Sequence, residues 1–104
     1  MILYNVTINI DYDCHDDWLK WMKQTHVPDV LDTGLFINAK ICRIHAEEQG
    51  GVSYSIQYLL NSKSDYNTYQ DLYAPKLQQE HTQKFSGKFV AFRTLLEVVY
   101  EKQP

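Results

Sequence analysis

The sequence has little of what marks a secreted or membrane protein. Among 104 residues there are two cysteines, Cys14 and Cys42, which are too few for a disulfide framework, so we expect free thiols. No apolar run is long enough for a membrane-spanning helix. The opening residues, MILYNVTINI, lack the basic segment of a signal peptide. We therefore expect a cytoplasmic protein with no membrane partner.

An excess of positive charge is also missing. The formal net charge is −3 at pH 7, whereas nucleic-acid binding needs a basic face. Residues 87–92, GKFVAF, are similar to a signature of RNA-recognition modules, but they fall on the last expected strand and not on the third. We expect no nucleic-acid partner.

Glycine and proline are few, at four and three residues, and 44% of the chain is hydrophobic. This composition predicts one globular domain over residues 1–104. Alternating apolar and polar residues predict strands, and apolar residues at helical spacing predict helices. The expected strands cover residues 2–10, 35–46, 52–60 and 88–100. The expected helices lie between the first two strands and between the last two. We expect a kink in each, at Pro28, which disfavours helical geometry at Val27, and at Pro75.

The element order β-α-β-β-α-β predicts an α+β protein of the ferredoxin-like class. Its four-stranded antiparallel sheet carries both helices on one face. The other face is open, and we expect it to carry mostly polar side chains from the first and third strands. The last strand is apolar on both sides near its end, which favours cover on both faces. We therefore expect a homodimer formed through the open sheet face and the last strand, with a partly polar cavity between the two sheets.

The direction of two basic residues depends on the register of the second strand. One loop length places Arg43 and His45 on the face of Tyr54, and a loop longer by one residue places them beside Ser53 on the polar face. We expect the polar face, because a buried unpaired arginine would be costly.

His26 is the candidate catalytic residue. It lies two residues before Pro28, and an imidazole that titrates near neutral pH can act as a general acid or base. The alternative is a structural role, in which its ring bonds backbone groups that Pro28 leaves free.

The candidate ligand-binding residues are Arg43 and Arg93, which could hold an anionic group, with Tyr54 and Gln57 adding hydrogen bonds. The alternative for the arginines is a cross-strand ion pair with Glu97 or Glu47. The remaining histidines lack the spacing of metal ligands, so we predict no metal and no cofactor.

Several stretches resemble a known superfamily. The strand and helix order, with His26 and Pro28 closing a tryptophan-bearing helix before Gly34, resembles the dimeric α+β barrel proteins. That superfamily includes antibiotic-biosynthesis monooxygenases and haem-degrading relatives. A closer resemblance, to a small family of similar length catalogued as a domain of unknown function, is carried by WLKWMKQTHVPDVLDTGLF, YSIQY and KFVAFRTLLEVVY.

Two functional hypotheses follow. In the first, the dimer binds a small organic molecule and is a cofactor-free enzyme that acts on an aromatic or polyketide-like compound by proton transfer or oxygenation. In the second, it is a non-catalytic dimeric regulatory or interaction module.

Overall fold

The computed structural model describes residues 1–46 and 50–104. The strands are β1 (Ile2–Asp11), β2 (Phe36–Arg43), β3 (Gly51–Leu60) and β4 (Phe89–Glu97). The first helical region comprises η1 (Tyr12–Cys14), α1 (His15–Trp21), the π-helix η2 (Met22–His26) and α2 (Val27–Leu31). The second comprises α3 (Lys63–Leu72) and α4 (Ala74–Lys84). In the described ranges, no helix is long and apolar enough to cross a membrane.

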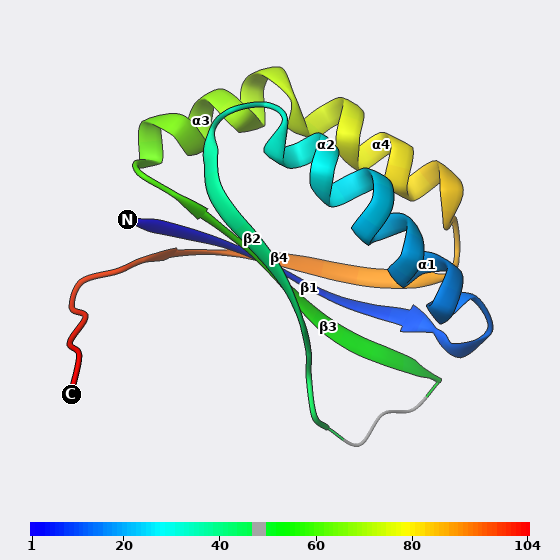
Figure 1. Cartoon of the computed structure of the whole chain (residues 1–104). Coiled ribbons are helices and arrows are strands. Elements are labelled where there is room, and N and C mark those ends of the chain that lie inside the picture. The colour runs from blue at the N-terminus through cyan, green and yellow to red at the C-terminus, as the bar shows by residue number, and fades with distance from the viewer. Residues whose placement is uncertain (47–49) are drawn as a thin grey trace.

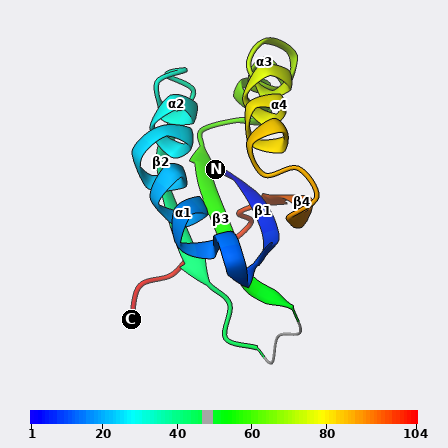
Figure 2. The same ribbon diagram turned by 90° about the vertical axis from the view of Figure 1, so that its right-hand side faces the viewer.

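The four strands form one antiparallel sheet in the order β2-β3-β1-β4. Both helical regions lie on the same face of this sheet, and its other face is uncovered (Figure 1). Seen along the sheet, α1 with α2 and α3 with α4 stand side by side above the strands (Figure 2). The predicted ferredoxin-like α+β fold is confirmed.

The alternation of β1 explains which face is covered. Ile2, Tyr4, Ile8 and Ile10 are buried beneath the helices, whereas the residues between them are only partly covered. Strand β3 alternates in step, because Tyr4 pairs with Tyr58 and Ile8 pairs with Tyr54. The core between sheet and helices therefore consists of one side of each central strand.

The first helical region keeps helical geometry up to Pro28. The sequence predicted non-helical geometry at Val27, but Val27 is helical, with φ −63° and ψ −45°. The chain widens into a π turn instead, in which the Val27 N–H bonds the carbonyl of Met22, and Pro28 lies in the first turn of α2. A wide turn of this kind accommodates the missing proline donor without ending the helix. Gly34, with φ +80°, lies just beyond the helix end, as expected.

The second helical region follows the sequence pattern closely. The hydroxyl oxygen of Ser62 accepts a hydrogen bond from the Asp65 N–H at 3.2 Å and caps α3. Pro75 lies in the first turn of α4, where its missing donor costs little. The region is therefore two helical pieces joined at Tyr73, as predicted.

The expected direction of Arg43 was wrong. Arg43 pairs with Tyr54, so it shares the helix-covered face with Tyr54 and not the polar face with Ser55. We disfavoured this register because it would bury an unpaired arginine. Arg43 is not buried, however, because it lies exposed at the end of the edge strand β2. His45 lies beyond that end and is also exposed. Residues 47–49 of the expected hairpin loop, including Glu47, lie outside the described residues.

The last strand ends earlier than predicted, at Glu97 in place of Tyr100. The Val98 N–H still bonds the Met1 carbonyl at 3.0 Å, and the residues after it leave the sheet. Large apolar side chains of β4 and the following residues remain exposed on the described chain: Val90, Phe92, Leu95, Leu96, Val98, Val99 and Tyr100.

Candidate functional site

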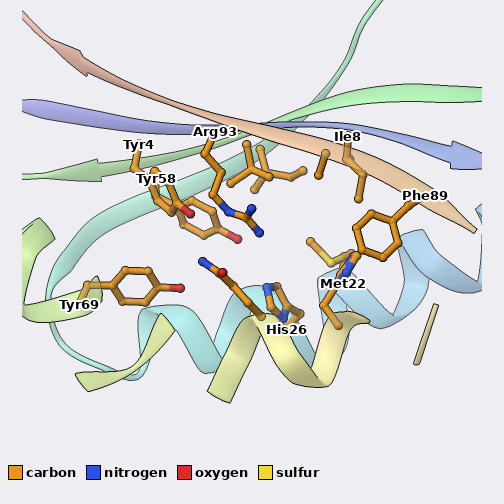
Figure 3. A pocket seen from close by; sticks show the side chains of 13 residues that line it. Tyr4, Ile8, Met22, His26, Tyr58, Tyr69, Phe89 and Arg93 are labelled. Carbon is orange, nitrogen blue, oxygen red and sulfur yellow. The ribbon is translucent and has the colours of Figure 1, made fainter. Parts of the chain in front are cut away.

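A cavity lies between the sheet and the helices of the single chain. Strand residues form one wall and helix residues the other, and the full lining is Tyr4, Val6, Ile8, Met22, His26, Ile56, Tyr58, Tyr69, Gln78, His81, Phe89, Ala91 and Arg93. Its volume is about 40 Å³, which is room for roughly three water molecules. Figure 3 shows Tyr4, Tyr58 and Arg93 reaching down from the strands toward Tyr69 and His26.

Arg93 is the cavity residue with a permanent charge. It pairs with Val6 of β1, so its side chain projects on the helix-covered face, and its guanidinium points into the space above His26 (Figure 3). No carboxylate is among the described residues that line the cavity. The ion pairs found in the described chain are His15–Asp16 and Lys88–Asp13, so the alternative role of Arg93, an ion pair with Glu97, is not formed there. Because Arg93 as a whole remains exposed, the cavity opens to solvent beside β4.

Three tyrosines surround the guanidinium of Arg93. Burial raises the pKa of Tyr4, Tyr58 and Tyr69, and the charge of Arg93 opposes that rise in each pKa. The three rings also pack together, with Tyr4 stacked on Tyr58 at 5.8 Å and tilted against Tyr69 at 6.1 Å between ring centroids. The phenols therefore stay protonated at neutral pH and can donate hydrogen bonds.

His26 stands opposite Arg93 at the end of the π turn. Its Nδ1 atom is buried and has no hydrogen-bond partner in the described chain, whereas most buried polar atoms of proteins are paired. Burial lowers its pKa to about 4, the nearby Asp29 carboxylate raises that pKa, and the Arg93 charge lowers it. His26 is therefore neutral at physiological pH, with a free nitrogen beside the cavity.

His81 is a site residue that the sequence analysis did not single out. It is 8% exposed, and its Nε2 accepts a hydrogen bond from the Trp18 indole N–H at 2.9 Å. Burial lowers its pKa to about 4, assisted by the neighbouring His26 and Arg93. The usable signal was its spacing, because His81 continues the buried stripe of Ala74 and Leu77 on α4.

The structure brings together two of the five predicted site residues, His26 and Arg93. Tyr54 is buried under α1, where its hydroxyl contacts the His15 ring. Gln57 lies on the open face and donates to the Ser55 hydroxyl at 3.2 Å. Arg43 is exposed at the far edge of the sheet. Arg43 and Arg93 therefore do not point into one space, and the binding roles of Arg43, Tyr54 and Gln57 stay predictions.

The arrangement can hold an anion and share a proton with it. Arg93 supplies a positive charge with a planar set of donors, and the phenols supply further donors. His26 supplies a neutral imidazole, and Met22, Ile8 and aromatic rings line the space around it. No group of three or more metal-ligating side chains is found in the described residues.

The chain matches one family over nearly its whole length. Residues 1–99 match the family described as "Domain of unknown function (DUF4286)". No sequence among the curated proteins matches the chain.

Solved structures with the same fold are distant in sequence. A dimeric ferredoxin-like protein from an uncultured marine organism is 17% identical, with a TM-score of 0.74 and full coverage of both chains. The protein MhuD, solved with two manganese protoporphyrin IX molecules per active site, is 12% identical, with a TM-score of 0.72 and full coverage of both chains. SnoaB, a cofactor-independent oxygenase from Streptomyces nogalater, is 6% identical, with a TM-score of 0.68 over 96% of this chain and 95% of that one.

The two depressed histidine pKa values predict a loss of stability in mild acid. Between the ordinary pKa of 6.5 and the folded value of about 4, the unfolded chain binds a proton that the folded chain does not. The free energy of unfolding therefore falls as pH falls through this window, by roughly 2–3 kcal/mol for His81. We expect His81→Gln, which keeps an acceptor for Trp18, to remove that part of the fall in urea denaturation measured from pH 7 to pH 4.

The control for this measurement is His45→Gln, because His45 is exposed and outside the strands. It should leave the pH profile of unfolding as in the wild type. An H81Q profile that is as steep as the wild-type profile would show that His81 is not held neutral by its burial.

Proposed function

This chain belongs to the DUF4286 family, and we propose that it binds a small organic anion in the cavity between its sheet and helices. The observation that carries the proposal is Arg93, a cation that faces the cavity without a carboxylate among the described lining residues. This cation lies at the solvent-open side of the cavity, next to three protonated phenols and two neutral imidazoles. A ligand carboxylate or enolate balances it through charge-assisted hydrogen bonds.

The cavity size limits what the ligand can be. Cavities for drug-sized ligands hold about 300–1,000 Å³, whereas this cavity holds about 40 Å³. The enclosed part therefore fits the anionic head of a ligand, and the rest of the molecule extends toward the open side beside β4. A protoporphyrin, which MhuD binds, does not fit this cavity, so we derive no haem chemistry from the likeness.

The same geometry supports a cofactor-free enzyme that acts by proton transfer or oxygenation on an aromatic or polyketide-like anion. With a pKa of about 4, His26 is a weak base in the free protein. An anion bound at Arg93 offsets the positive charge that disfavours the imidazolium, and so it raises the pKa of His26, while burial, the larger cause of the low pKa, stays in place. SnoaB, described as a cofactor-independent oxygenase, shows that the fold can host such chemistry.

Benzoate, a small aromatic carboxylate, tests the proposal. We expect benzoate to shift the NMR signals of cavity residues, and Arg93→Gln to weaken its binding tenfold or more, because a hydrogen bond to a charged group contributes about 1.5–3 kcal/mol. Benzamide, which has the same shape without the charge, should bind the wild type more weakly than benzoate.

The matched control is Arg43→Gln, which removes an exposed arginine at the other edge of the sheet. It should bind benzoate as the wild type does. Equal affinities of wild type and R93Q, or a loss of binding in R43Q alone, would contradict the proposal.

We further propose that two copies of the chain associate through the open sheet face and β4. Phe92 and Val90 project on that face beside Thr7 and Asn9, and they are 64% and 71% exposed. With Leu96 they form an apolar strip along the polar residues of β1 and β3, as expected for a surface that another protein covers. The likeness to proteins described as dimeric ferredoxin-like supports a second copy as the occupant.

A charge in the centre of this strip tests the association. We expect Phe92→Glu to convert a dimer into a folded monomer, because two buried carboxylates would face each other across the two-fold axis. Native mass spectrometry at micromolar concentration gives the readout. Leu72→Glu is the control, since Leu72 is similarly exposed, at 69%, but lies on the helical side. A monomeric wild type would rule out the association.

A further inference from the structure

The buried hydrogen bond between Trp18 and His81 fixes a protonation state. Trp18 is fully buried, and its indole Nε1 lies 2.9 Å from Nε2 of His81. An indole N–H donates and cannot accept. Nε2 of His81 must therefore carry a lone pair, so the one ring proton of the neutral imidazole lies on Nδ1.

The surroundings of His81 keep the ring in this state. Its ring packs against Phe89 at 4.5 Å, Phe85 at 5.7 Å and Trp21 at 5.8 Å between centroids, so rotation away from Trp18 is hindered. The titratable or charged side chains that face it are His26 from the first helical region and Arg93 from β4. Neither attracts a second proton, because one is neutral and the other is positive.

His26 lies in the opposite situation. Its ring is 5.7 Å from that of His81 between centroids and 5.2 Å from that of Trp21, but its Nδ1 atom has no partner in the described chain. The two imidazoles of the cavity are therefore distinguished by their hydrogen bonds. Nε2 of His81 accepts a hydrogen bond from Trp18, whereas Nδ1 of His26 has no hydrogen-bond partner among the described residues.

We propose that Trp18 is a positioning residue that holds His81 as a neutral hydrogen-bond donor, and that His26 is the imidazole that can take up a proton. The tautomer follows from the Trp18–His81 bond alone, whereas the use of His81 toward a ligand rests on the proposed function. Donors of this kind, the guanidinium of Arg93 and the one N–H of the cavity-lining His81, select a ligand with acceptor oxygens. A carboxylate that also carries a carbonyl or enolate oxygen meets this requirement.

Long-range ¹H–¹⁵N NMR of the uniformly ¹⁵N-labelled protein tests the tautomer directly. At pH 7 we expect the Nε2 of His81 to show the shift of an unprotonated nitrogen and Nδ1 that of a protonated one. In Trp18→Phe, which removes the donor, Nε2 becomes free to protonate. The titration midpoint of His81 should then rise by roughly one pH unit or more.

The control is Trp21→Phe, because Trp21 touches His81 through its ring and should leave the His81 tautomer unchanged. If Trp18→Phe does not fold, the wild-type spectrum still decides, since a proton on Nε2 of His81 overturns the inference. A wild-type His81 that takes up its proton at the same pH as in W18F would also overturn it. These outcomes are independent of benzoate binding by Arg93, so either proposal can fail while the other stands.

Discussion

The structure depends on the side-chain alternation of β1, one of the two central strands that are hydrogen-bonded on both sides. Strand β1 pairs with β3 along one edge and with β4 along the other, so its register sets the facing of three strands. Its apolar residues fix the face that the helices cover, and a slip by one residue would move every side chain to the other face. Because Val6 faces the helices, its partner Arg93 does so too. The position of the permanent charge that Arg93 brings to the cavity is thus a consequence of how the core packs.

The cavity combines two electrostatic conditions. It contains a cation that the described lining does not pair with a carboxylate, and it contains imidazoles whose burial keeps them neutral. In water these groups would interact weakly, but a partly dry site strengthens the interaction between charges several-fold. A bound anion would therefore raise the proton affinity of His26, as the nearby Asp29 carboxylate already does. Through this coupling, anion binding at Arg93 would make His26 a better base.

The fold could be predicted from the sequence because its signals are local. Alternation and the interruption at Pro75 each depend on a few neighbouring residues, and the structure follows them. Two predictions were wrong. Val27 stays helical because a π turn accommodates the proline, and Arg43 takes the face of Tyr54 because the edge of the sheet leaves it in solvent.

Only part of the candidate site could be predicted, because contacts between residues far apart in the sequence form it. His26 and Arg93 stood out by residue type, but nothing near either residue shows that they share a cavity. His81 was passed over because metal-like spacing was sought, whereas its significance comes from Trp18, 63 positions earlier in the chain. Tyr4, Tyr58 and Tyr69 looked like ordinary core aromatics until Arg93 was placed among them.

The most direct test of the account is a crystal structure of the protein with 4-bromobenzoate, located by the anomalous scattering of bromine. The account predicts one bromine site beside β4 in each chain, with the carboxylate within hydrogen-bond distance of the Arg93 guanidinium. A bromine site on the open sheet face, with the helix–sheet cavity unchanged, would contradict it. That outcome would indicate a ligand site between the sheets of two subunits, in which Arg93 takes no part.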